Sequence, residues 1–209
     1  MTLLQENVSK EKVYVFQVNE NLLPLLQKTK SIIDNSRKTN NLKLEAHEET
    51  YEIKNHESNF LLSDPELEPL NSWFQECINF AIKDLGLEKE ELEITRCWGN
   101  IFDDLNFSKR HTDKNSLISG IFILSDSKNK KIFLSYSRSV WYKMILNHSG
   151  NRNWYPDLFP GQLILFPSSV PHGSTPGEKS NSLYTISFNT FLKSVPKQNL
   201  NYKETENSI

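Results

Sequence analysis

The fold is decided by the stretch Pro160-Gly161-Gln162-Leu163-Ile164-Leu165-Phe166-Pro167, which Pro171-His172 follow closely. The proline–glycine pair predicts a turn. The apolar run after it is typical of a buried strand. Two further prolines bound the loop that follows, and this loop would present His172 at a rim. The stretch therefore predicts a buried strand with a histidine beyond its end.

Working outward from this strand, the pattern is strand-like from residue 91 onward. Candidate strands are 92–98, 116–124, 131–137, 162–166 and 183–191, and residues 12–18 add one near the N-terminus. Many short strands separated by proline and glycine turns favour a β-sandwich or a jelly roll. Gly120 inside a candidate strand predicts a bulge or a close backbone approach.

The first third of the chain is helical in character. Leucines and isoleucines recur at helical spacing over 22–33. Ser63-Asp64-Pro65-Glu66 is a helix-start signature, and Gly86 stands where a C-cap glycine belongs. Between these two positions, apolar residues repeat at i, i+3 and i+4 from Leu67 to Leu85. We expect two helices outside an eight-stranded roll, with residues 36–58 forming a loop that holds at most one short strand.

Composition limits the class of protein. The chain has 209 residues, with 37% hydrophobic, 24% charged and a net charge of -2, which suits a soluble globular protein. Without a basic field, nucleic acid is not an expected partner. No apolar run approaches the ~20 residues that span a bilayer, and the N-terminus lacks a signal-peptide core, so we expect a cytoplasmic protein. Cys77 and Cys97 are interpreted as buried thiols rather than a disulfide.

The segment His111-Thr112-Asp113 carries the chemistry. In a strand, side chains two apart share a face, so an imidazole and a carboxylate can point to one place. His172 would complete a two-histidine, one-carboxylate triad, which suits non-heme Fe(II) that activates oxygen. Taken singly, His111 could lie on a charged rim and His172 could cap its own turn. We interpret the remaining histidines, His47, His56 and His148, as surface residues.

With these residues in place, the chain resembles the Fe(II)- and 2-oxoglutarate-dependent oxygenases, in particular a small group of members that is common in marine bacteria and their phages. The segments that carry the resemblance are Trp98-Gly99-Asn100-Ile101-Phe102, His111-Thr112-Asp113, Ser119-Gly120-Ile121-Phe122, residues 160–168, Pro171-His172-Gly173 and Ile186-Ser187-Phe188-Asn189. They span residues 92–191. The resemblance implies a double-stranded β-helix, with His111, Asp113 and His172 as iron ligands. It also implies 2-oxoglutarate as co-substrate, O2 at the last open position on the iron, and release of succinate and CO2.

One departure from the family concerns the far carboxylate of 2-oxoglutarate. The family has an arginine about ten residues past the distal histidine, and Leu183 occupies that slot here. Thr185 and Ser187 would share its face, so hydroxyls remain. A buried carboxylate needs a partner. Arg138 is the first candidate for it, and Lys131 and Arg96 are the second choices.

Two asparagines match polar positions of the family. Asn100 could donate to the 1-carboxylate of the co-substrate, and Asn189 falls at another strand end. For either residue, capping of a turn is an alternative role. The insertion at 138–160 carries Trp141, Tyr142, Trp154 and Tyr155. It could form a lid over the metal or pack as a satellite cluster.

The resulting hypothesis is one domain over residues 1–194. Residues 1–90 would form a helical extension packed on the roll, 91–194 the double-stranded β-helix, and 195–209 a disordered tail. The chain would be a dioxygenase, monomeric or homodimeric, that hydroxylates a small molecule or a side chain. Two alternatives stay open: a non-heme iron oxygenase that uses another keto acid or none, and a catalytically silent β-roll that serves as a binding module.

Overall fold

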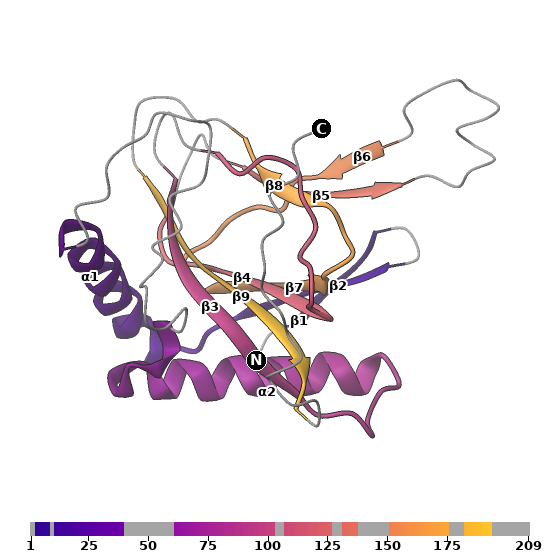
Figure 1. Ribbon diagram of the computed structural model, residues 1–209, viewed down its shortest axis with the longest axis horizontal. Coiled ribbons are helices and arrows are strands. Elements are labelled where there is room, and N and C mark those ends of the chain that lie inside the picture. The colour runs from indigo at the N-terminus through magenta and orange to yellow at the C-terminus, as the bar shows by residue number, and fades with distance from the viewer. Residues whose placement is uncertain are drawn as a thin grey trace.

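The protein is described by a computed structural model that covers residues 3–8, 11–39, 61–102, 107–126, 131–137, 151–175 and 182–193. Within these residues, nine strands form two antiparallel sheets. The main sheet has the order β1-β2-β7-β4-β9-β3, and the small sheet has the order β6-β5-β8. Figure 1 shows the small sheet on one side of the main sheet and α2 on the other. The predicted mainly β fold with flanking helices is confirmed.

The strands are β1 (Leu3–Val8), β2 (Glu11–Gln17), β3 (Leu92–Phe102), β4 (Ile118–Ile123), β5 (Ile132–Ser137), β6 (Asn151–Trp154), β7 (Gln162–Pro167), β8 (His172–Ser174) and β9 (Leu183–Leu192). The helices are α1 (Leu23–Thr39) and α2 (Glu68–Asp84), with short 3-10 turns at Glu20–Leu22, Leu61–Ser63 and Pro65–Leu67. The sequence predicted β2, β3, β4, β5, β7 and β9, but β1, β6 and β8 were not predicted.

The stretch that opened the sequence argument forms β7, between β2 and β4 in the main sheet. Gly161 precedes it with φ +81°, a conformation that favours glycine. Its N–H donates to the carbonyl of Ile123 over 2.8 Å, which joins the turn to β4. Residues 162–166 of β7 are all buried. The predicted turn and buried strand are therefore confirmed.

Helix α2 covers the outer face of the main sheet (Figure 1). Asp64 accepts the backbone N–H of Glu66 and starts the 3-10 turn that leads into the helix. Phe74 packs on the rings of Phe122 and Phe188, with centroid distances of 5.0 and 5.1 Å. The predicted helix start and apolar stripe are confirmed, and Gly86 follows the helix with φ +74°.

Gly120 is the place where β4 makes room for this packing. It lies directly opposite Phe188 on β9, and a Cβ at this position would overlap the Phe188 ring. The pairing of β4 with both neighbours shows no register shift here. The glycine therefore admits an aromatic ring, rather than a bulge or a neighbouring backbone.

A second apolar cluster fills the space between the two sheets. It includes the inward side chains of the main sheet and of β5, namely Val13, Phe102, Ile121, Ile123, Ile132, Leu134, Ile164, Phe166, Val170 and Leu183. Residues before position 91 contribute to this interior, because β2 pairs with β7. The N-terminal third thus supplies two strands of the main sheet besides the helices, and the sequence analysis predicted one of them, at residues 12–18.

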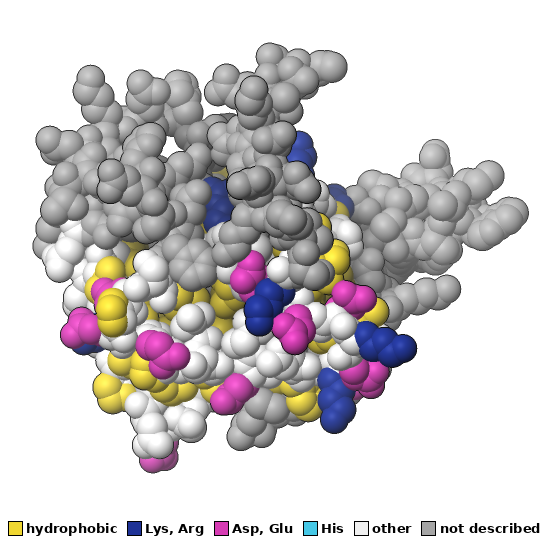
Figure 2. Space-filling view, turned by 60° about the horizontal axis from the view of Figure 1, so that its bottom comes forward, with side chains coloured by type: hydrophobic (Ala, Val, Ile, Leu, Met, Phe, Trp, Pro, Cys, Tyr) yellow, Lys and Arg dark blue, Asp and Glu magenta, His cyan; other side chains and the backbone are white. Residues whose placement is uncertain are grey.

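The distribution of charge on one face of the molecule and the state of the two cysteines can be compared with the sequence analysis. On the face shown in Figure 2, acidic and basic side chains are interspersed with hydrophobic ones. None of the described helices has the length and apolar character that crossing a membrane requires. Cys77 and Cys97 are free and buried, as predicted.

Candidate metal centre

The backbone brings His111 and His172 side by side. His172 begins β8, and His111 forms an isolated antiparallel bridge with it. The His111 N–H donates to the His172 carbonyl over 3.0 Å, and the reverse bond measures 2.8 Å. The two ring centroids are 4.3 Å apart. A single bridge thus pairs His111 with His172, whereas the sequence analysis predicts a regular strand through His111 and Asp113.

Asp113 completes the group two residues further along this loop. Its N–H donates to the Ser168 carbonyl over 3.2 Å, which fixes the loop against the end of β7. Its carboxylate oxygens lie 3.8 Å from His111 Nε2 and 3.7 Å from His172 Nε2. One potential ligand atom from each of the three residues lies within 4.8 Å of the others. The structure therefore brings together the three side chains that the sequence analysis singled out.

Backbone carbonyls orient both imidazoles. Nδ1 of His111 lies 2.8 Å from the Lys109 carbonyl, and Nδ1 of His172 lies 3.1 Å from the Val170 carbonyl. A carbonyl only accepts, so each Nδ1 carries the proton and each Nε2 keeps its lone pair. Both lone pairs are then available on the side where Asp113 lies. This arrangement suits metal ligation.

The three residues differ in exposure. The His172 and Asp113 side chains are 8% and 11% exposed, whereas that of His111 is 45% exposed, so the group opens to solvent beside His111. Burial lowers the pKa of His172, because the charged ring loses hydration. The Asp113 carboxylate opposes this shift, and His111 adds to it. The neutral form that can bind a metal is thereby favoured.

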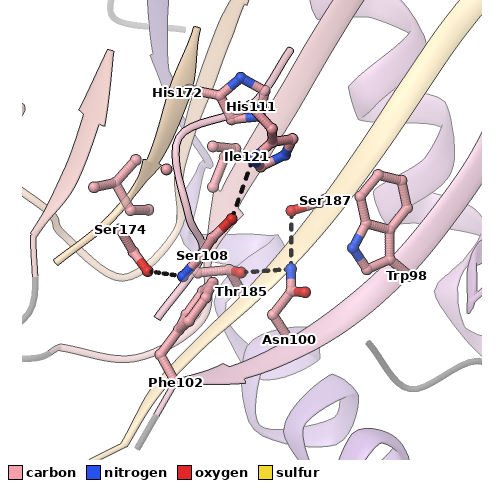
Figure 3. Close-up of a pocket in the computed structure, with 12 residues that line it drawn as sticks. Trp98, Asn100, Phe102, Ser108, His111, Ile121, His172, Ser174, Thr185 and Ser187 are labelled. Atoms are coloured by element: carbon pink, nitrogen blue, oxygen red, sulfur yellow. Dashed lines mark hydrogen bonds between the residues drawn. The ribbon is translucent and has the colours of Figure 1, made fainter. Parts of the chain in front are cut away.

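A cavity of about 60 Å³ adjoins the two histidines. Its walls come from β3, β4, β5, β8, β9 and the loop before His111, and the lining residues are Trp98, Asn100, Phe102, Ser108, His111, Ile121, Ile132, His172, Gly173, Ser174, Thr185 and Ser187. Figure 3 shows Asn100 beside the hydroxyls of Thr185 and Ser187. The Asn100 Nδ2 atom donates to both, over 3.1 and 2.9 Å. One wall of the cavity is therefore polar and uncharged.

Leu183 stands at the apolar end of this interior. It is fully buried, opposite Phe102 of β3, and belongs to the cluster between the sheets. No lysine or arginine occurs among the described residues that line the cavity. The first candidate for a replacement cation, Arg138, lies outside the described residues.

Arg96 and Lys131 do not fill the vacant arginine position. Arg96 pairs with Asn189, six residues along β9 from Leu183, or about 20 Å at the rise of an extended strand. Its guanidinium lies 4.9 Å from the centroid of the Trp98 ring. Lys131 is exposed, with its Nζ 5.8 Å from the Tyr155 ring. Neither residue lines the cavity, so Arg138 stays the first candidate.

Asn189 lies near the carboxylate end of the site rather than in the cavity. Its Oδ1 is 3.5 Å from Ser119 Oγ, and Ser119 donates to Asp113 Oδ2 over 2.5 Å. The sequence analysis did not include Ser119 among the site residues. A signal for Ser119 was present in the sequence, since it is a hydroxyl residue at a core position of a predicted strand. Polar groups at such positions need a hydrogen-bond partner.

The aromatic insertion is described only from residue 151 onward. Trp154 packs against the cluster between the sheets. Tyr155 contacts the ring of Phe133 at a centroid distance of 6.2 Å. Neither residue lines the cavity, so this part packs as a satellite cluster. Trp141 and Tyr142 lie outside the described residues, and a lid formed by them stays a prediction.

Solved structures with the same fold are 2-oxoglutarate-dependent oxygenases. The α-ketoglutarate-dependent carbocyclase SnoK from nogalamycin biosynthesis has a TM-score of 0.62 at 10% identity, over 89% of this chain and 84% of its own. A Pseudomonas putida prolyl-4-hydroxylase has a TM-score of 0.56 at 13% identity, over 88% and 95%. HygX from Streptomyces hygroscopicus, solved with nickel and 2-oxoglutarate bound, has a TM-score of 0.51 at 9% identity, over 85% and 81%. These likenesses confirm the double-stranded β-helix.

A sequence comparison finds a similar family. Residues 96–189 match the family model described as "Putative 2OG-Fe(II) oxygenase". The matched residues, which make up less than half of the chain, contain Asn100, His111, Asp113 and His172. No curated protein matches the chain.

Proposed function

We propose that the protein is an Fe(II)- and 2-oxoglutarate-dependent dioxygenase that hydroxylates its substrate and releases succinate and CO2. The observation that carries the proposal is the convergence of His111, Asp113 and His172 beside a cavity in a double-stranded β-helix. The family match over residues 96–189 supports the same reaction class.

The three side chains fit the proposed metal by their donor chemistry. Two Nε2 lone pairs and a carboxylate form the donor set of the facial triad that suits non-heme Fe(II). The Lys109 and Val170 carbonyls hold the imidazoles in the required tautomer. His111, Asp113 and His172 would therefore hold the iron. The iron and the keto acid together supply the oxidising chemistry when bound.

The rest of the site would bind and orient the organic groups. Asn100, with Thr185 and Ser187, offers an amide and two hydroxyls on one wall of the cavity. The two hydroxyls accept from Asn100 and keep their own protons, so they can donate hydrogen bonds to a keto-acid carboxylate. Ile121 and Ile132 line the same cavity and would exclude water from it. The exposed edge of His111 leaves the substrate a route to the metal from solvent.

A second candidate function rests on Leu183. Its apolar surroundings cannot pair with a far carboxylate, and a buried unpaired charge is strongly disfavoured. Either Arg138 supplies the cation from outside the described residues, or the co-substrate is a keto acid with no second carboxylate. We propose 2-oxoglutarate with Arg138 as the principal case and a short or uncharged keto acid as the second.

The proposed substrate is a small molecule or an amino-acid side chain, acted on by a cytoplasmic monomer or homodimer. The mixed charge of the face in Figure 2 supports this better than a polyanionic partner. The absence of a membrane-crossing helix among the described residues agrees with it.

The test combines binding with turnover. Protein purified without oxygen is loaded with Fe(II), and succinate release from 2-oxoglutarate is followed with ascorbate and a panel of candidate substrates. Binding of pyruvate, 2-oxobutyrate and 2-oxoglutarate to the metal-loaded protein is measured in parallel, with an Arg138→Ala variant. Tight 2-oxoglutarate binding that Arg138→Ala weakens supports the principal case. Preference for the monocarboxylic acids supports the second. Failure to retain any metal would refute both and leave a catalytically silent binding module.

A further inference from the structure

A row of buried serine hydroxyls leads away from the Asp113 carboxylate into the main sheet. The Ser119 hydroxyl donates to Asp113 Oδ2 over 2.5 Å, and Ser168 Oγ lies 2.7 Å from Ser119 Oγ. Ser168 in turn bonds to Ser116 Oγ over 2.7 Å. Ser119 is 2% exposed and Ser168 1% exposed. Ser116, at the far end of the row, is only partly buried, so the two hydroxyls nearest Asp113 are the ones shielded from bulk water.

Three strands hold the row in place. Ser119 lies on β4, opposite Phe166 of β7. Ser168 directly follows β7, and its N–H donates to the Leu117 carbonyl over 3.1 Å. On the side of β9, the N–H of Thr190 donates to Ser116 Oγ over 3.3 Å. The hydroxyls therefore sit on a rigid part of the sheet, whereas Asp113 itself lies on a loop.

Ser168 controls Asp113 from two directions. Its carbonyl accepts the Asp113 N–H over 3.2 Å, which fixes the main chain. Its hydroxyl contacts Ser119, which fixes the carboxylate. Serine is a costly choice at such buried positions unless its hydroxyl is used. Here the use is the orientation of one side chain on the edge of the cavity.

We infer that Ser119, supported by Ser168, is a positioning residue that fixes the plane of the Asp113 carboxylate beside the two histidines. The inference rests on the proposed metal centre. The Ser119 hydroxyl donates to Oδ2, which lies 3.7 Å from His172 Nε2, while Oδ1 lies 3.8 Å from His111 Nε2. A partner that holds a ligand in this way orients it for the metal.

The test uses Co(II), whose binding can be measured in air by calorimetry and by visible absorption, on the full chain. Ser119→Ala should weaken Co(II) binding by about 10- to 100-fold, the range for partners of metal ligands. It should also change the absorption bands of the saturated protein, because the plane of the carboxylate is then no longer held beside the two histidines. Ser168→Ala, one bond further out, should have a smaller effect of the same kind.

Ser135→Ala is the matched control. The Ser135 hydroxyl is equally buried and donates to Asn153 Oδ1 over 2.5 Å, so this variant loses a comparable bond. It should leave Co(II) affinity and the spectrum unchanged. Thermal unfolding of the metal-free proteins checks that the variants are folded. If Ser119→Ala reduces stability too far, Ser168→Ala carries the same test.

Two outcomes separate this inference from the proposed function. If Asp113→Ala abolishes Co(II) binding while Ser119→Ala binds like wild type with the same spectrum, the positioning role is refuted and the metal centre stands. If Asp113→Ala also binds Co(II) like wild type, the metal centre itself is refuted. An equal loss in Ser119→Ala and Ser135→Ala would likewise refute the positioning role.

Discussion

Replacement of Asp113 by alanine tests the metal centre most directly. The carboxylate is 11% exposed and lies 3.8 and 3.7 Å from the two histidine Nε2 atoms. In the metal-free protein its removal costs one hydrogen bond from Ser119, which corresponds to roughly 1–3 kcal/mol of unfolding free energy. The chain should therefore still fold, but one of the three donors is lost.

The magnitude follows from ligand linkage. A metal that binds only the folded state at 100 times its Kd adds about 2.7 kcal/mol of stability. For a chain of this size, each kcal/mol shifts the Tm by about 2–4 °C. Saturation with Co(II) should therefore raise the Tm of the wild-type protein by about 5–11 °C. The same addition should leave the Tm of Asp113→Ala unchanged, because its affinity is too low at that concentration.

The assay is thermal unfolding followed by circular dichroism, with and without Co(II), on the two proteins and on Asp157→Ala. Asp157 is an exposed carboxylate outside the site, and this control should respond like wild type. An equal Tm increase in Asp113→Ala and wild type would refute the assignment of the carboxylate as a ligand. Absence of any increase in wild type would refute the centre as a whole.

Three other perturbations are expected to act as follows. Gly120→Ala should lower the free energy of unfolding by about 1–3 kcal/mol, because its methyl group overlaps an aromatic ring in the core. A loss below roughly 0.5 kcal/mol in urea unfolding, which is the range typical of surface substitutions, would contradict this packing. Asn100→Ala should weaken 2-oxoglutarate binding by about tenfold in calorimetry, since the amide that orients the Thr185 and Ser187 hydroxyls is lost. Unchanged affinity would exclude a role of Asn100 in co-substrate binding. Hydrogen bonds from Lys12, and then from Tyr14, lower the pKa of Asp84. The stabilising contribution of Asp84 is present above pH 3.8 and lost as pH falls through its lowered pKa. Asp84→Asn should therefore make the free energy of unfolding fall less steeply with decreasing pH at acid pH. An unchanged pH dependence in this variant would contradict the role of the two hydrogen bonds.

The strands that the sequence predicted are those with strong local signals. β7 has a turn at its start and a continuous apolar run, and α2 has a start signature and a regular stripe. β8 could not be found in this way, because it has three residues and one is glycine. β6 reads Asn-Arg-Asn-Trp, which shows no apolar alternation. Such strands exist because a neighbour offers hydrogen bonds, and that information is not local.

The same distinction applies to the site. The pattern His-x-Asp with a distal histidine could be recognised in sequence, since residue types and order carry it. A replacement cation could not be chosen from residue types and order alone, because the distance of Arg96 from Leu183 depends on the pairing of β3 with β9. Ser119 and Ser168 lie in segments that carry the resemblance, but their contact could not be predicted, because only the pairing of β4 with β7 brings them together.

The strand order has a consequence for the timing of folding during synthesis. Apart from β1 and β2, no neighbours in the main sheet follow one another in sequence. Tyr14 on β2 pairs with Leu165 on β7, and at about 5–20 residues per second a ribosome needs roughly 8–30 s to make the intervening chain. β9, which lies between β4 and β3, is made last of all the described strands. The complete sheet therefore forms only after residue 192 has been added. Until β7 has been made, the β2 edge of the early hairpin lacks its partner strand, and unpaired strand edges are prone to aggregation.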